Sequence, residues 1–275
     1  MHVMKTVISA ALAMLWLCAS AGANATIAPL SDWQCQMMQR HSVLPSDAPI
    51  GCQRLAKVEF EFIHFNGDIK VGNVIVLDVV AAAVAAIFAD LKQQGFPLHS
   101  ARLMREFSGD DNASMNANNS SAFNARAISG GRSWSKHAYG VAIDINPLQN
   151  PFLSFDDAGN ISVAPAQSAA NYVNRNRYRA RAEVTRQGMA EAAVEVFAHH
   201  GFLIWGGDWN QPIDTQHFEV GSRALVQQLV ELPPAQASAL FQRYRDDYRH
   251  CRSLNTNMPN EQARAHCAYQ TVQAY

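Results

Sequence analysis

The stretch Ser133–Pro147 reads S-W-S-K-H-A-Y-G-V-A-I-D-I-N-P and holds a histidine and an aspartate seven positions apart. That spacing is not the i, i+4 spacing of a helical pair, so it predicts His137 in a loop and Asp144 in a following strand. Gly140 allows the chain to turn sharply between them. The residues after this glycine alternate, so Ala142 and Asp144 share one face of the strand, and the small alanine keeps the space beside the carboxylate open.

A second short segment, Asp214–Glu219, reads D-T-Q-H-F-E. Together the two segments offer two imidazoles and two carboxylates. These are ligand types of zinc (Zn2+), whose catalytic sites keep one coordination position open for water. We predict that His137, Asp144 and His217 hold the zinc and that Asp214 handles a proton.

Glu219 lies two positions after His217 in an expected strand, so both side chains point to the same face. The carboxylate could then orient the imidazole. The alternative for each of these residues is a place in a hydrogen-bonded core with no metal. The occurrence of two such segments in one chain favours the metal site.

The composition indicates an ordinary globular protein. The chain has 275 residues, 48% hydrophobic and 16% charged, with a formal net charge of -1. This length suits one domain, or one domain with an appendage. The near-neutral charge gives no electrostatic case for binding to nucleic acid or to an anionic membrane.

Residues 1–25 have the pattern of a secretory signal peptide. Lys5 precedes an apolar run over residues 6–21, and small residues follow, which predicts cleavage after Ala23 or Ala25. A retained membrane anchor is the alternative, but the run is short for a membrane span. We therefore expect an exported protein, periplasmic or secreted, with no integral membrane segment after cleavage.

Four cysteines remain once the signal is removed, and they allow three disulfide connectivities. They are Cys35, Cys52, Cys251 and Cys267. Pairing of neighbours, Cys35 with Cys52 and Cys251 with Cys267, closes the shortest loops and is our prediction, although pairing between the two ends of the chain stays open. All four lie far in sequence from the His/Asp segments, which indicates structural disulfides in an oxidising compartment.

The first half of the chain predicts a hairpin followed by a buried helix. Residues 58–65 alternate as in a strand, Asn66-Gly67 indicates a type I′ turn, and the return strand is expected over 69–77. The apolar segment 79–94, between Asp78 and Gly95, predicts a helix. A further strand is expected over 100–107.

The second half predicts more loop than regular structure. We expect a functional polar loop over 108–124 and a long loop over 148–180. A helix is expected over 185–200, followed by a strand over 202–205. Residues 222–248 read as helical segments broken at Pro233-Pro234.

The paired motifs S-x-H-x-x-G-x-A-x-D and D-x-x-H-F-E resemble those of zinc peptidases of the D-alanyl-D-alanine carboxypeptidase group. That group includes VanY-type carboxypeptidases, D-Ala-D-Ala dipeptidases and phage endolysins that cleave L-alanyl-D-glutamate bonds. The resemblance covers residues 57–221. It implies an α+β fold, of the LAS type, with a small, mainly antiparallel sheet and packed helices.

The resemblance also implies roles for individual residues. His137, Asp144 and His217 would be the zinc ligands, Asp214 the general base, and Ser135 a residue that orients the ligand loop.

Family members also use an arginine to polarise the scissile carbonyl. The usual G-Y-R-S-x-x-x-Q pattern is absent from this sequence. Arg126 is our prediction, with Arg102 and Arg105 as rivals. Trp205 and Trp209, together with the 108–124 loop, are expected to wall the cleft.

The predicted function is an exported zinc peptidase that hydrolyses the stem peptides of peptidoglycan. Both an L-Ala-D-Glu endopeptidase and a D-Ala-D-Ala carboxypeptidase fit the motifs. The alternatives are a non-catalytic zinc- or peptidoglycan-binding module and a secreted wall-degrading toxin. We expect four segments: the signal peptide 1–25, a disulfide-stapled lead-in 26–56, the peptidase domain 57–221 and a helical segment 222–275.

Overall fold

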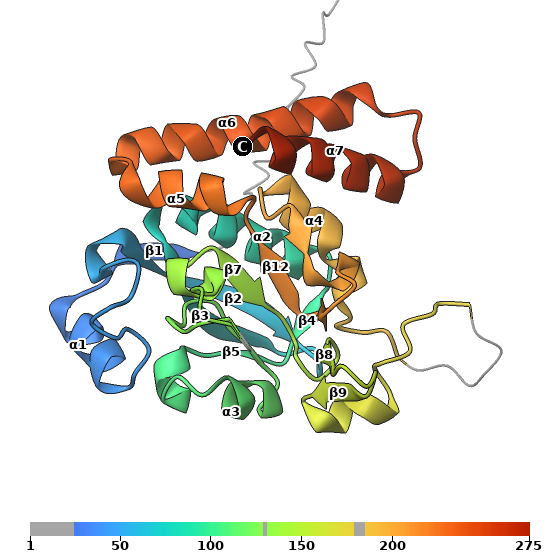
Figure 1. The fold of residues 1–275 in the computed structure, drawn as a ribbon, viewed down its shortest axis with the longest axis horizontal. Coiled ribbons are helices and arrows are strands. Elements are labelled where there is room, and N and C mark those ends of the chain that lie inside the picture. The colour runs from blue at the N-terminus through green and yellow to red at the C-terminus, as the bar shows by residue number, and fades with distance from the viewer. Residues whose placement is uncertain (1–24, 129–130, 179–184) are drawn as a thin grey trace, which may run out of the picture.

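A computed structural model describes residues 25–128, 131–178 and 185–275 (Figure 1). The predicted signal peptide lies outside the described residues, except for its last residue. The fold is α+β, as predicted, with several small sheets that are mostly antiparallel. The helices α5, α6 and α7 are stacked along one side of the molecule, over α2 and α4, and α3 lies on the opposite side of the sheets (Figure 1).

The scaffold of the fold is the predicted hairpin. β2 (Leu55–His64) and β3 (Ile69–Leu77) pair over their whole length, and β1 (Thr26–Pro29) and β4 (Pro97–Leu98) both add to β2. Alternate residues of β2 are buried because its inner face meets α2 (Ala81–Gln93). The stacking of Phe60 of β2 on Phe88 of α2, with ring centroids 3.6 Å apart, shows this contact.

The hairpin turn differs in type from the prediction. Gly67 has φ +89°, but Asn66 is not among the residues with positive φ, which both central positions of a type I′ turn require. The His64 amide donates to the Asp68 carbonyl at 2.7 Å, so the loop has three residues and ends in the left-handed glycine. The asparagine–glycine pair therefore located the hairpin correctly but gave the wrong turn.

A second sheet carries the last three residues of each predicted motif. Its order is β10 (Ile204–Trp205), β12 (His217–Glu219) and β7 (Ala142–Asp144), all antiparallel. His217 pairs directly with Asp144 in this register. Two segments more than 70 residues apart in sequence thus become neighbours through backbone hydrogen bonds.

The first sheet also fixes the turn that leads into the second one. His137 lies in the 3-10 helix η4 (Lys136–Tyr139), which ends at Gly140 with φ +66°. The Gly140 carbonyl accepts a hydrogen bond from the Leu77 amide at 2.9 Å, at the end of β3. The histidine segment is therefore held against the scaffold by the backbone.

The remaining elements surround these two sheets. β8 (Phe152–Phe155) pairs with β9 (Ile161–Ala164) and with β11 (Ile213–Asp214), and β5 (Ser100–Ala101) pairs with β6 (Asn119–Ser120). The other helices are α1 (Asp32–Arg40), α3 (Asp111–Asn116), α4 (Val194–His199), α5 (Arg223–Glu231), α6 (Pro234–Leu254) and α7 (Asn260–Ala274). Short 3-10 helices are η1 (Cys52–Arg54), η2 (Asp78–Val80), η3 (Met104–Phe107), η5 (Ala166–Ala170), η6 (Ala190–Ala192) and η7 (Gly206–Asp208).

Several predicted elements are wrong in extent. The strand expected over 100–107 is limited to β5, and a 3-10 helix follows it. The helix expected over 185–200 is only α4, preceded by η6 among the described residues. The long loop expected over 148–180 contains the hairpin of β8 and β9, and the lead-in contains β1 as well as α1.

The C-terminal helices and the disulfides agree with the sequence. The break at Pro233-Pro234 separates α5 from α6, because proline suits the first turn of a helix but not its interior. Cys35 bonds to Cys52 and Cys251 to Cys267, the predicted pairing of neighbours. Within the described part of the chain, no helix has the length and apolar character needed to cross a membrane.

Replacing Gly140 with alanine should destabilise the protein more than the same change at Gly67. Both glycines have positive φ, so the strained backbone conformation should lower the free energy of unfolding of both alanine variants by about 1–2 kcal/mol. A Cβ on Gly140 would also lie 2.5 Å from the Leu77 amide nitrogen, whereas nothing lies within 4 Å of one on Gly67. We expect Gly140→Ala to lose about 1–3 kcal/mol more free energy of unfolding. Urea unfolding of metal-free protein measures this, and equal losses would contradict it.

Candidate active site

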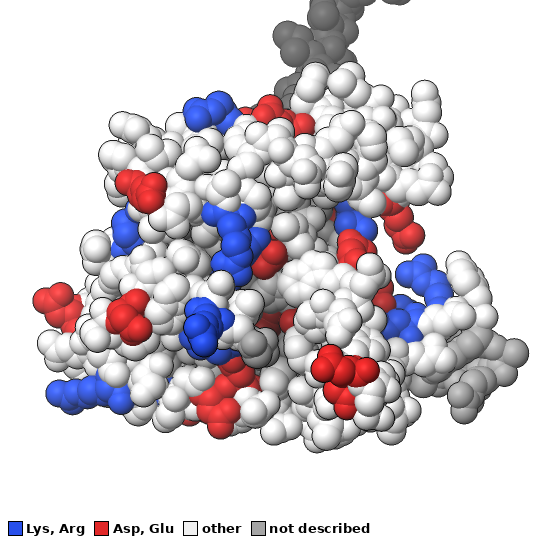
Figure 2. Space-filling model, in the orientation of Figure 1, with Lys and Arg blue, Asp and Glu red and all other residues white. Residues whose placement is uncertain are grey.

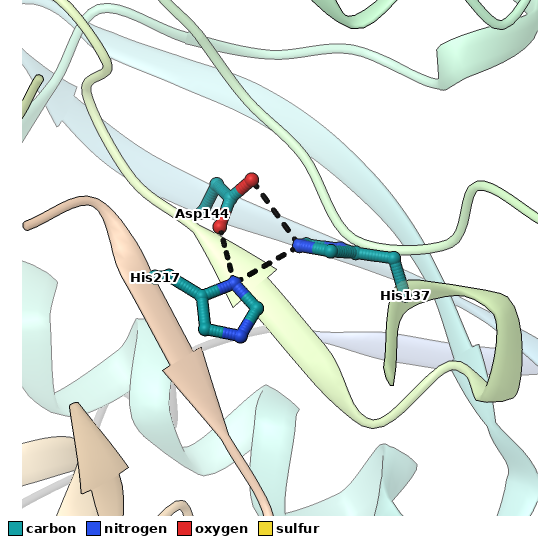
Figure 3. Close-up of side chains that lie close together, drawn as sticks. All are labelled: His137, Asp144 and His217. Atoms are coloured by element: carbon teal, nitrogen blue, oxygen red, sulfur yellow. Dashed lines mark hydrogen bonds and ion pairs between the residues drawn. The ribbon is translucent and has the colours of Figure 1, made fainter. Parts of the chain in front are cut away.

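Three of the predicted site residues meet at one point (Figure 3). His137 Nε2 lies 3.1 Å from His217 Nδ1 and 3.2 Å from Asp144 Oδ2. His217 Nδ1 lies 2.9 Å from Asp144 Oδ1. The two imidazoles are buried, and the aspartate is nearly so. They are the one group of three potential metal-ligating side chains found among the described residues.

The outer nitrogen of each imidazole faces a group that can only accept a hydrogen bond. His137 Nδ1 is 2.6 Å from the carbonyl oxygen of Ala122, and His217 Nε2 is 3.0 Å from Glu219 Oε2. Both outer nitrogens must therefore carry the hydrogen. In the neutral rings the two inner nitrogens are then bare lone pairs, and they face each other and the Asp144 carboxylate.

Three lone-pair donors can share one point only around a positive charge. A zinc ion with bonds of about 2.0–2.1 Å spaces tetrahedral ligand atoms about 3.3 Å apart, close to the separations observed. The two nitrogens and one oxygen match the ligands that zinc takes in catalytic sites, and three protein ligands leave a fourth position open. The site therefore fits zinc.

Without a metal, a proton supplies the charge. Burial alone lowers the pKa of His217, but its hydrogen bonds to Asp144 and Glu219 outweigh this and raise the pKa to about 10. Burial likewise raises the pKa of Asp144, but the two histidines outweigh it and hold that pKa well below its usual range. The histidine then exists as an imidazolium that zinc must deprotonate.

Asp214 lies in the same cavity, on β11. Burial, followed by the negative charge of Asp144, raises the pKa of Asp214 to about 7. Its Oδ1 is buried and bonds to no described residue. A Cβ on Gly206 would lie 2.4 Å from the Asp214 carbonyl oxygen, so the glycine allows the two segments to approach closely. A carboxyl group with this pKa suits proton transfer near neutral pH.

The cavity around these residues has a volume of about 560 Å³. In Figure 2, acidic and basic side chains gather near the middle of the face where Figure 1 shows β7 and β12. Besides the motif residues, the walls are formed by Asp111, Asn112, Ser114 and Met115 from α3, by Ser121, Arg126 and Ile128, and by Phe152, Ala164, Trp209, Pro212, Gln216 and Arg223. The segment 108–124 therefore does line the cavity, but it was wrongly predicted to be a loop, because it contains α3 and β6.

The structure separates the three arginine candidates. Arg126 lines the cavity, where its guanidinium forms an ion pair with Asp111 of α3. Arg102 instead pairs with Glu106 at 2.8 Å. Arg105 lies over the ring of Trp33, 5.2 Å from its centroid. Of the three, only the first lies near the metal-ligating group.

The two predicted tryptophans have different surroundings. The Trp209 ring lines the cavity, and its centroid lies 5.3 Å from the centroid of the His217 ring. The Trp205 ring stacks on the buried Phe218, and its Nε1 donates to the Thr215 carbonyl at 2.9 Å. This second tryptophan therefore supports β12 from behind, and we no longer expect it in the cleft wall. Ser135 lines the cavity, and its hydroxyl accepts a hydrogen bond from the His137 amide at 3.3 Å.

Sequence reasoning missed several residues of the cavity. Arg223 comes from the first turn of α5, and Phe152 comes from a segment that had been expected to be loop. Lys136 stands inside the first motif, beside a ligand, and that position was the one available signal for it. Its Nζ is buried and lies 2.8 Å from Glu219 Oε1. Burial lowers the pKa of this lysine, and the glutamate partly offsets the shift.

The comparison with known families agrees with this geometry. Residues 129–220 match the model of a peptidase family described as D-alanyl-D-alanine carboxypeptidase. The matched region spans both motifs and so contains all three ligand candidates and Asp214. No curated protein and no solved structure matches the chain. The resemblance seen in the sequence is confirmed by the family match.

Zinc binding should release at least one proton at pH 8.5, because the His217 imidazolium must lose its proton to become a ligand, and water at the open zinc position can lose a second. At that pH Asp214 is already ionised and contributes little. Calorimetric titration in two buffers of different ionisation enthalpy counts the protons. His137→Ala, which removes a ligand, is the control and should bind zinc far more weakly. Tight binding without proton release would contradict the imidazolium form of His217 in the metal-free protein.

Proposed function

We propose that this chain, whose residues 129–220 belong to the D-alanyl-D-alanine carboxypeptidase family, is an exported zinc-dependent peptidase that cleaves stem peptides of peptidoglycan. The observation that carries the proposal is the combination of a metal-fitting His137–Asp144–His217 group with a buried carboxyl group in one cavity. A structural zinc site would not need that carboxyl group, so Asp214 favours catalysis over a binding module. The two disulfides suit an oxidising compartment.

The residues of the cavity divide the hydrolysis between them. Zinc bound by the three ligands would supply a Lewis acid for the water and for the scissile carbonyl. Asp214 accepts the proton that the attacking water loses, and then passes it to the amine that leaves. The products are a new carboxylate and a free amine. Burial raises the pKa of Asp214 above the ordinary value of a carboxyl group, which helps it both to accept and to return a proton.

Arg126 is the proposed partner of the carbonyl oxygen. Its ion pair with Asp111 fixes the guanidinium at the wall of the cavity. A fixed cation beside the developing oxyanion stabilises the transition state without having to reorganise. Trp209 and the residues of α3 form apolar and polar walls that would hold the peptide on either side of the reacting bond.

Wild-type protein should cleave purified stem peptides, and a chelator should abolish the cleavage. Asp214→Asn should lower kcat/KM by about 10²–10⁴-fold, the usual contribution of a general base, while still binding one zinc. In the wild type, kcat/KM should fall at acidic pH as Asp214 becomes protonated. Because zinc favours the carboxylate, the midpoint of that fall should lie below the metal-free value of about 7.

Mass spectrometry of the digest identifies the bond. Release of terminal D-alanine alone would assign the carboxypeptidase activity, and separation of L-alanine from D-glutamate the endopeptidase activity. Zinc-loaded wild-type protein that cleaves neither bond would overturn the proposed function in favour of a binding module. Equal activity of the wild type and Asp214→Asn would instead remove the aspartate from the mechanism.

The arginine assignment has a matched test within the chain. Arg126→Ala should lower kcat by about 10²–10³-fold, the effect of removing one oxyanion donor. Arg102→Ala, which breaks the surface pair with Glu106, should leave kcat within about twofold, because exposed ion pairs contribute little. Steady-state kinetics on the identified stem peptide measures both. Similar losses in the two variants would refute the assignment.

A further inference from the structure

A buried ion pair connects the two segments that carry the histidine ligands. Lys136 is only 7% exposed, and its Nζ lies 2.8 Å from Glu219 Oε1. The same Nζ donates to the Val220 carbonyl at 3.2 Å and to the Gly221 carbonyl. All three hydrogens of the ammonium group therefore have an acceptor, and all three acceptors belong to β12 or the two residues after it.

We propose that Lys136 is a positioning residue of the zinc site, which holds the ligand His217 in its coordinating orientation through Glu219. This inference rests on the proposed zinc-dependent function. The Nζ of the lysine bonds to Glu219 and to two backbone carbonyls but to none of the three ligand side chains, so its effect on His217 passes through the carboxylate. It adds a role for the residue between Ser135 and His137 in the first motif.

The glutamate can orient the imidazole because both of its oxygens are engaged. Oε1 accepts from Lys136, and Oε2 faces His217 Nε2 at 3.0 Å. Rotation of the carboxylate would break one bond or the other, so the lysine fixes the position of the second oxygen. That oxygen in turn fixes the ring, whose Nδ1 then points to Asp144 Oδ1. The chain of contacts thus ends at the atom that would bind zinc.

The same lysine also sets the distance between the two ligand segments. It belongs to η4, which carries His137, and it binds the end of β12, which carries His217. Gly221 is held from the other side, because its amide donates to the Tyr244 hydroxyl of α6 at 3.1 Å. The ammonium group therefore lies between the histidine turn and a strand end that the C-terminal helices support.

Stability alone explains this pair poorly. Removing an ammonium and a carboxylate from water costs several kcal/mol for each ion, and their attraction repays this only when the geometry is good. Apolar side chains of similar volume often serve stability as well or better. Positioning supplies the missing reason, since an apolar pair could not present an acceptor to His217 Nε2.

The test compares Lys136→Met with Lys92→Met. Lys92 forms an ion pair of similar length, 2.6 Å, with Glu61, but this pair is half-exposed and joins α2 to β2. Zinc affinity is measured by competition with a chromophoric chelator, and the geometry of the site by the visible absorption of the cobalt-substituted protein. We expect Lys136→Met to weaken zinc binding about 10–100-fold and to shift the cobalt bands. Lys92→Met should match the wild type in both.

A purely structural role predicts a different result. If Lys136→Met lowers the melting temperature of the metal-free protein but keeps the wild-type zinc affinity and cobalt spectrum, the proposal is overturned. Should this variant fail to fold, the double variant Lys136→Met/Glu219→Gln is compared with Glu219→Gln alone, because the double variant leaves no unpaired buried carboxylate. Zinc binding should be about tenfold weaker or more in the double variant than in Glu219→Gln, because only the single variant keeps the lysine that holds residue 219. Equal zinc affinity in these two variants would also overturn the proposal.

The outcome is separable from that of the proposed function. Zinc binding by the wild type, with stem-peptide cleavage, supports the function whatever the lysine variants show. Normal zinc affinity and a normal cobalt spectrum in the lysine variants refute only the positioning role. Absence of zinc binding in the wild type would refute the proposed function itself, and with it the premise of this inference.

Discussion

The site depends on three lone pairs that the fold forces to face one another. The Ala122 carbonyl and the Glu219 carboxylate each fix the hydrogen of one imidazole on its outer nitrogen. The inner nitrogens of His137 and His217 are thereby aimed at each other and at Asp144. Such an arrangement is repulsive until a cation enters it, as a proton or as a metal ion. The folded protein therefore needs a positive charge, from a proton or a metal ion, between His137, Asp144 and His217.

The two sheets have separate tasks in meeting that constraint. The long hairpin of β2 and β3, packed on α2, carries none of the three ligand residues, but it anchors Gly140 through the amide of Leu77. The short sheet of β7, β12 and β10 pairs His217 with Asp144 in its register, and its Ile143 and Phe218 belong to the buried core. The hydrogen bond between Leu77 and Gly140 joins the hairpin to the segment that carries His137.

Where the sequence misled, tertiary packing had overridden a local pattern. The segment 100–107 was expected to form a strand, yet only Ser100–Ala101 find a partner, in the short β6. Trp205 stands in an aromatic and glycine-rich segment that resembled a cleft wall, but its ring packs on Phe218 behind the site. Local sequence pattern and composition indicate only which secondary structure a segment favours by itself. Which neighbour covers it is decided by other parts of the chain.

The sequence by itself predicted the hairpin and the residues of the metal-fitting group. The resemblance to known peptidases implied the α+β class, and the neighbouring cysteine pairs were the preferred choice among three connectivities. These features depend on short-range patterns or on ligand chemistry, which can be recognised in the sequence without knowledge of the fold. Only the tertiary structure decided that Arg126 rather than Arg102 lines the cavity, that Arg223 joins it, and that Lys136 reaches Glu219. Lys136 and Glu219 are 83 residues apart in sequence. The sequence around a long, flexible side chain does not show which distant residue it will contact, because that depends on how the backbone folds.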